Sequence, residues 1–339
     1  MFPIGSLPST PGSAYKLVCY FTYWSRDRQE TEKFTLESTD PFLCSHLIYS
    51  FASISNNKII IKDKNDAMLY QTISSLKTKI SVKNMLCNGN YFLFPKTRVL
   101  LLPTFHHMVD SSTLCLEFIN SVILFLRNHN FDGLDIAGFT RSERQHLFQC
   151  LAEAFQQDFV KSTKERLLLT AGVSAGRHMI DNSYQVKELV KELDFINLLS
   201  FDFHGSWEKP LITGHNSPLR NYKEEGWWDT GMPVEKVVMG IPMYGRSSTL
   251  ASAENTLGAP ASGPGAAGPI TKFSGFLAYY EICQFLKGAK ITRLQDHQVP
   301  YVVKGNQWVS YDDVESVETK VGRQEALGQQ NTHAVLRSC

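Results

Sequence analysis

The feature that most constrains the fold is an alternation of short β-branched and aromatic runs with longer amphipathic segments. Seven runs have the composition of buried strands: Lys16–Phe21, His46–Ala52, Lys83–Cys87, Phe131–Ala137, Leu167–Val173, Phe195–Phe201 and Val237–Ile241. Four segments between them carry apolar residues at helical spacings: Asp66–Leu76, Leu114–His129, Glu143–Lys161 and Ser183–Leu193. Repeated strand and helix units predict an α/β fold with parallel strands and right-handed crossovers.

The composition fits one large globular domain and excludes some classes of partner. The 339 residues are 43% hydrophobic and 12% aromatic, which is enough to bury a sizeable core. A formal net charge of +1 gives no electrostatic reason to expect nucleic acid or an anionic membrane as a partner. No apolar stretch approaches the roughly 18 residues of a membrane span. We therefore expect a soluble protein.

The strand and helix rhythm changes after the seventh strand. Leu257–Pro269 is rich in Gly, Ala and Pro, which argues against regular structure there. Gly275–Lys287 has a helical pattern, and Pro300–Tyr311 is typical of a hairpin that turns at residues 304–306. These two elements predict a small α+β insertion after strand seven. Only Thr332–Leu336 in the polar tail is suited to an eighth strand.

Two of the seven cysteines stand where neighbouring strands would bring them together. Cys19 lies in the first strand candidate and Cys44 just before the second, so a parallel barrel would place them within bridging reach. The alternative is a pair of buried thiols. No cysteine spacing matches a zinc site, and we expect neither a metal nor an organic cofactor. Residues 1–14 contain no recognisable signal peptide.

One strand carries a motif that resembles a known family. Residues 131–136, Phe-Asp-Gly-Leu-Asp-Ile, are similar to the start of the family-18 glycoside hydrolase signature, Asp-x-x-Asp-x-Asp-x-Glu. Four other segments fall where that family has them: Tyr15–Phe21, His46–Ala52, Leu199–Gly205 and Gly240–Arg246. The resemblance covers most of residues 15–321 and is to the chitinase-like lectin branch.

The resemblance implies a (β/α)8 TIM-type barrel, which we expect to be incomplete at strand eight. The expected organisation is an irregular segment at residues 1–14, barrel strands one to seven at 15–246, an α+β insertion domain at 247–311, and a helix with a degenerate tail at 312–339. An absent eighth strand would leave strands one and seven with open edges.

The departures from the signature indicate a protein that is not an enzyme. Strand alternation places Asp135, Ala137 and Phe139 on one inward face, where the family pattern has Asp at 137 and Glu at 139. In the family, that Glu protonates the leaving oxygen while the substrate's own N-acetyl group attacks the anomeric carbon. A methyl group and a phenyl ring cannot do this. Asp132 and Asp135 then remain as structural remnants of the motif.

Glycan binding needs fewer groups than hydrolysis does. Aromatic rings stack on the apolar faces of sugars, and a few polar groups meet the hydroxyls. The resemblance implies such a groove at the C-terminal mouth of the barrel, lined by Trp24, Asp202, Trp207, Tyr244 and Arg246. We therefore expect a lectin that binds chitooligosaccharides, the β-1,4-linked oligomers of N-acetylglucosamine.

The competing hypothesis is a degenerate or truncated family member without appreciable glycan binding. The strand-three turn is Cys87-Asn88-Gly89-Asn90 where the family has Ser-x-Gly-Gly, and the Trp that the family carries on strand eight is absent. The resemblance further implies an extracellular, secreted protein, although no signal peptide is recognisable. We expect a monomer whose partner is a glycan and not a nucleic acid.

Overall fold

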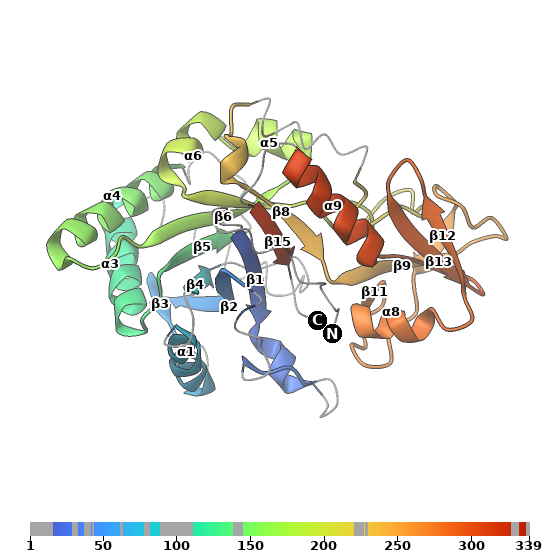
Figure 1. Cartoon of the computed structure of the whole chain (residues 1–339), viewed down its shortest axis with the longest axis horizontal. Helices are drawn as coiled ribbons and strands as arrows, with labels where there is room; N and C mark the ends of the chain where they lie inside the picture. Colours follow the sequence, from blue (N-terminus) through green and yellow to red (C-terminus); the bar gives the residue numbers. More distant parts are fainter. Residues whose placement is uncertain are drawn as a thin grey trace.

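Eight parallel strands pair into a ring in this computed structural model. The structure describes residues 16–28, 33–36, 42, 44–61, 64–77, 82–88, 111–137, 145–219, 227, 230–326 and 332–336. The strands of the ring are β1 (Lys16–Thr22), β2 (His46–Ser55), β4 (Lys83–Asn88), β5 (Gly133–Ala137), β6 (Leu168–Ser174), β7 (Phe195–Leu199), β8 (Val237–Pro242) and β15 (Thr332–Leu336). The pairing runs in this order and returns from β15 to β1 (Figure 1). The predicted (β/α)8 barrel is confirmed.

The last strand closes the ring, which corrects the expectation of an incomplete barrel with open edges. β15 is paired with β1 over four residues and with β8 over three. Its sequence signal is weak because the strand is short and its chain neighbours are polar. Without β15, the facing edges of β1 and β8 would present unpaired backbone N–H and C=O groups, and β15 pairs with both. The local sequence gives no signal for this long-range pairing.

Helices cover the outside of the ring (Figure 1). They are α1 (Lys64–Leu76), α3 (Ser112–Asn128), α4 (Gln145–Ser162), α5 (Arg177–Ser183) and α6 (Val186–Glu192). On α3 the buried face repeats at helical spacing through Cys115, Phe118, Ile119, Val122, Phe125 and Leu126. None of the described helices is long and apolar enough to cross a membrane. Short elements complete this layer: β3 (Lys58–Ile60), and the 3-10 helices η1 (Tyr23–Asp27) and η5 (Val234–Lys236).

The helix expected at residues 183–193 is present as α6, but it begins at Val186. The backbone of Tyr184 is extended, with φ −130° and ψ 133°, and it separates α5 from α6. The Tyr184 hydroxyl accepts a hydrogen bond from the Ser174 backbone N–H at 3.2 Å, and its ring packs 5.0 Å from the buried ring of Trp227. The contacts of Tyr184 with Ser174, the last residue of β6, and with Trp227 accompany this extended backbone.

Side chains fill the inside of the ring. One buried cluster there comprises Val18, Tyr20, Ile48, Met85, Cys87, Ala137, Phe195, Phe201, Val238 and Tyr244. The first residue of β5 is Gly133, and the space there requires a glycine. A Cβ atom at this position would lie 2.3 Å from the Leu168 carbonyl oxygen on β6. The expected bridge is present as well: Cys19 and Cys44 form a disulfide with 6.0 Å between their Cα atoms.

A second sheet lies beside the barrel, at the right of Figure 1. Its strand order is β10 (Ala261–Pro264), β9 (Tyr244–Leu250), β14 (Gln307–Ser310), β13 (Val299–Lys304) and β12 (Lys290–Leu294). β11 (Phe276–Ala278) also pairs with β9, and α8 (Tyr279–Phe285) follows it. The predicted hairpin is confirmed as β13 and β14, and Gly305 takes the left-handed conformation in its turn at φ +61°.

Two local expectations in this module hold only in part. The helix expected over residues 275–287 is confirmed as α8, but β11 precedes it, and the segment expected to be irregular, residues 257–269, contains β10. Both strands exist because β9 supplies an antiparallel partner from a distant part of the chain. The expected division between residues 246 and 247 stays a prediction, and β9 spans it.

A buried ion pair holds α9 (Val314–Ala326) to the residues just before it, and Ser217 links this pair to the segment after β7. Lys320, on α9, donates to the Asp312 carboxylate at 2.5 Å, and both side chains are at most 2% exposed. The Ser316 hydroxyl donates to the same carboxylate at 2.7 Å. Ser217, in the long segment after β7, also donates to Asp312. A buried charge is tolerated when it is paired and hydrogen-bonded in this way.

Ring closure by β15 makes a testable prediction. Deletion of residues 332–339 removes one of the two strand partners of β1 and of β8, so amide hydrogen exchange should accelerate in those two strands first. Exchange in β5, on the far side of the ring, serves as the internal control. Unchanged protection of β1 and β8 in the deletion variant would contradict closure by this strand.

Candidate functional site

The residues singled out from the sequence follow the carboxyl ends of three barrel strands. In barrels of this type, that end is where ligands bind. Trp24 lies in η1, directly after β1, and its side chain is outside the described residues. The two residues that follow it are anchored by their side chains: the Ser25 hydroxyl donates to the Phe34 carbonyl at 2.8 Å, and Arg26 donates to Asp66 on α1 at 3.1 Å.

Asp202, Tyr244 and Arg246 converge on one point of the mouth. The Tyr244 hydroxyl and the Arg246 Nε–H both donate to Asp202 Oδ1, at 2.7 and 2.8 Å. Asp202 itself has a left-handed backbone conformation with φ +59°, which is uncommon outside glycine. The Asp202 and Arg246 side chains are 17% and 13% exposed, while Tyr244 is 1% exposed. The structure therefore holds a partly accessible ion pair against a buried phenol.

Trp207 extends this group toward solvent. Its ring lies 4.9 Å from the Arg246 guanidinium and is 53% exposed. The ring also packs on Gly205, where a Cβ atom would lie 2.2 Å from it. Glu208 fixes the turn between them, because its carboxylate accepts from the Gly205 N–H at 3.1 Å and contacts His204 Nδ1 at 2.9 Å. A flat aromatic surface is thus presented at the mouth.

Asp135 lies below the mouth, inside the barrel, with no exposed surface. Its carboxylate accepts from Tyr20 at 2.9 Å, Cys87 at 3.1 Å, Thr170 at 2.7 Å and Asn197 at 3.0 Å. These donors come from β1, β4, β6 and β7. Burial raises the pKa of Asp135 above its usual range, while the four hydrogen bonds act in the opposite direction. The carboxylate is occupied by the protein itself.

After Asp135, the described residues of the strand signature include no further carboxylate. Ala137 is buried in the interior cluster, and its methyl group faces Gly172 on β6. Phe139, Glu143, Gly89 and Asn90 lie outside the described residues.

Asp132 stands at the start of β5, at the opposite end of the strand from the mouth. It forms an ion pair with Lys77 at 2.8 Å and accepts from the Asn84 backbone N–H at 2.6 Å. Asp132 therefore ties β5 to the start of β4.

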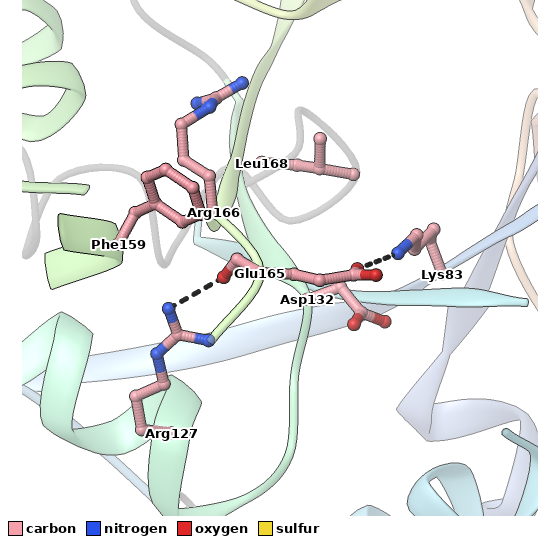
Figure 2. Close-up of a pocket in the computed structure, with 7 residues that line it drawn as sticks. All are labelled: Lys83, Arg127, Asp132, Phe159, Glu165, Arg166 and Leu168. Atoms are coloured by element: carbon pink, nitrogen blue, oxygen red, sulfur yellow. Dashed lines mark hydrogen bonds and ion pairs between the residues drawn. The ribbon is translucent and has the colours of Figure 1, made fainter. Parts of the chain in front are cut away.

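A cavity of about 360 Å³ opens at the same end as Asp132. Figure 2 shows Lys83 and Arg127 both reaching Glu165, the first at its carboxylate and the second at its backbone oxygen. Arg127 also pairs with Asp158, and Arg166, a further lining residue, pairs with Asp194. The cations that line the cavity are therefore matched by internal anions. Its place among the strand starts separates it from the mouth.

Two contacts of the mouth were not expected from the sequence. The ring of Phe276 stacks on Tyr244 with 4.9 Å between centroids and lies 5.7 Å from the Arg246 guanidinium. Phe276 belongs to β11, whose pairing with β9 has no local sequence signal. Glu208 was missed as well, because its contacts with His204 and Gly205 depend on the turn that the structure shows after β7. In the described part of the chain, no three His, Cys, Asp or Glu side chains gather as a metal site.

Comparison with known proteins is consistent with this geometry. Residues 16–328 match the model of the glycosyl hydrolases family 18. The chain is 70% identical to human (Homo sapiens) chitinase-3-like protein 2 over 330 residues, 91% of this chain and 83% of the relative. It is 42% identical to mouse (Mus musculus) chitotriosidase-1 over 347 residues, 94% of this chain and 72% of the relative.

Solved structures show the same likeness. Human YKL-39, described as a pseudo-chitinase with retained chitooligosaccharide binding, superposes with a TM-score of 0.89 at 67% identity, over 96% of this chain and 92% of that one. A YKL-39 structure determined in the presence of GlcNAc4 superposes with a TM-score of 0.88 at 66% identity and the same coverage.

The buried carboxylate gives the prediction for this site. Asp135→Ala leaves four buried donors without their acceptor, so the free energy of unfolding should fall by more than about 3 kcal/mol in urea denaturation. Thr170→Val removes one donor and leaves three, and should cost about 1 to 2 kcal/mol. Equal, small losses in the two variants would show that the convergence on Asp135 contributes little.

Proposed function

We propose, from the premise that this chain belongs to glycosyl hydrolase family 18, that it is a non-catalytic lectin for chitooligosaccharides. The observation that carries the proposal is a mouth that keeps an aromatic surface and a polar pair, Trp207 with Asp202 and Arg246, beside a strand without the catalytic acid. This combination permits sugar binding and withholds the proton that hydrolysis requires.

The two kinds of group have separate tasks in the proposed groove. The exposed ring of Trp207 offers a stacking surface for the apolar face of a pyranose, and the Arg246 guanidinium behind it keeps the ring in place. Asp202 accepts hydrogen bonds and Arg246 donates them, so both are suited to hydroxyl and acetamido groups. Tyr244 is buried, and we assign it the task of holding Asp202. The family resemblance also assigns Trp24 to the groove, and this assignment stays a prediction because its side chain is outside the described residues.

The loss of hydrolysis follows from the residues at positions 137 and 139. Ala137 and Phe139 cannot donate a proton to a leaving oxygen, a contribution worth about 10² to 10⁴ in rate. The retained Asp135 is fully buried and already accepts four hydrogen bonds. That YKL-39 is a pseudo-chitinase that binds chitooligosaccharides supports the same division of binding from catalysis here.

The competing hypothesis of a degenerate, non-binding protein loses one of its grounds. That hypothesis rested partly on open barrel edges, and β15 supplies the missing neighbour. The chain does lack Trp at residues 312–339, so the proposed groove has no aromatic from the eighth strand. We infer weaker binding than in a relative that carries one.

We also propose that the protein acts outside the cell as a monomer. The Cys19–Cys44 disulfide supports an extracellular location, because such bonds persist in oxidising compartments and are rare in the cytosol. The partner is a glycan, and the near-neutral net charge of +1 offers nothing to a polyanion such as nucleic acid.

The groove is tested by removing its exposed aromatic ring. Trp207→Ala should weaken chitotetraose binding by about 1 to 3 kcal/mol in isothermal titration, because the stacking surface is lost. The matched control is Phe159→Ala, an aromatic of similar exposure, 42%, that lines the cavity at the opposite end of the barrel. Equal effects of the two substitutions would place the groove elsewhere.

A further inference from the structure

The segment that follows β7 contains a buried amide that contacts the groove from behind. Asn216 has no exposed surface. Its Oδ1 accepts from the Asp202 backbone N–H at 3.0 Å, and its Nδ2 donates to the Tyr244 carbonyl at 3.3 Å. One side chain therefore links the two residues whose own side chains meet at the mouth. The two contacts also fix its orientation, because only the oxygen accepts and only the nitrogen donates.

The backbone of Asn216 is held as firmly as its side chain. Its N–H donates to the Ser310 hydroxyl at 3.1 Å, and its carbonyl accepts from the Phe203 N–H at 3.2 Å. Residue 215 adds a second anchor, since His215 Nε2 contacts the carbonyls of Pro300 and Tyr311 at 3.0 and 3.1 Å. The amide is thus a fixed point between the loop after β7 and the second sheet.

The backbone of Asp202 explains why a fixed point is needed. A non-glycine residue at φ +59° is in a sparsely populated conformation that persists only when its surroundings hold it there. The Asn216 side chain captures the backbone N–H of that residue. This conformation points the Asp202 carboxylate at Tyr244 and Arg246, and Arg246 in turn lies under the ring of Trp207.

We infer that Asn216 is a positioning residue of the glycan groove, which it never touches: it sets the Asp202 carboxylate and, through it, the Arg246 guanidinium and the Trp207 ring. The inference rests on the proposed function for its binding consequence, while the positioning itself is independent of any sugar. Loss of the amide frees Asp202 to leave the left-handed region, and the ion pair beneath Trp207 then loosens.

The positioning is tested first without a ligand. In the wild-type protein the Arg246 Nε–H donates to Asp202 at 2.8 Å and should give a shifted, exchange-protected NMR signal. Asn216→Ala should abolish that protection. The matched control is Ser217→Ala, which removes the neighbouring hydrogen bond to Asp312 and leaves Asp202 untouched. If Asn216→Ala fails to fold, Asn216→Ser, with a side chain too short to bridge, is used and should give the same loss.

The binding consequence is tested with a double-mutant cycle and chitotetraose. Asn216→Ala should weaken affinity about tenfold in the wild-type background and less than about twofold when Asp202 is already alanine, because the amide acts through that residue. An unchanged Arg246 signal in the Asn216 variant, or the same loss in Ser217→Ala, overturns the inference. If wild-type protein binds no chitotetraose while the signal depends on Asn216, the proposed function fails and the positioning stands.

Discussion

Asp135 sits inside the barrel with no exposed surface, and four hydrogen-bond donors from four other strands converge on it. A buried carboxylate is costly unless its oxygens are hydrogen-bonded, so each donor is constrained to one position on its strand. That constraint links β1, β4, β5, β6 and β7 through a single group and fixes the rotation of each strand about its own axis. The positions of the fixed strands also determine where the loops of the mouth begin, because the loops that carry Trp24 and Asp202 leave the ends of β1 and β7.

The same carboxylate shows that a residue of a catalytic motif can be retained for a structural role. Asp135 belongs to a catalytic signature by resemblance, yet in this chain it acts as an acceptor inside the barrel. The mouth residues proposed to bind need no acid: a ring, a guanidinium and a carboxylate held against a buried phenol are groups suited to recognition of a sugar. Under this proposal, the residues at positions 137 and 139 withhold the chemistry of hydrolysis, while the groups proposed to bind the glycan are retained.

Sequence reasoning succeeded where the signal is local or carried by a motif. Runs such as His46–Ala52 are apolar and β-branched enough to indicate strands by themselves, and Trp207 and Arg246 lie beside segments that match the family. It was weaker where pairing is long-range. Thr332–Leu336 was identified as a possible strand, but its closure of the ring between β1 and β8 was not expected, and the strand at Phe276 exists only against β9. Asn216 was missed for the same reason, since it lies in a polar segment without periodicity and its partners are distant in sequence.

The most direct test of the central claim is isothermal titration of the wild-type protein with chitotetraose and chitohexaose. After the titration, the oligosaccharides in the calorimeter cell are analysed by mass spectrometry. The account predicts saturable binding, tighter for the longer oligomer because it covers more of the groove, and both oligosaccharides recovered at full length after prolonged incubation. Absence of binding by folded protein would contradict the lectin function. Recovery of shortened oligomers, abolished by Glu143→Gln, would contradict the loss of catalysis.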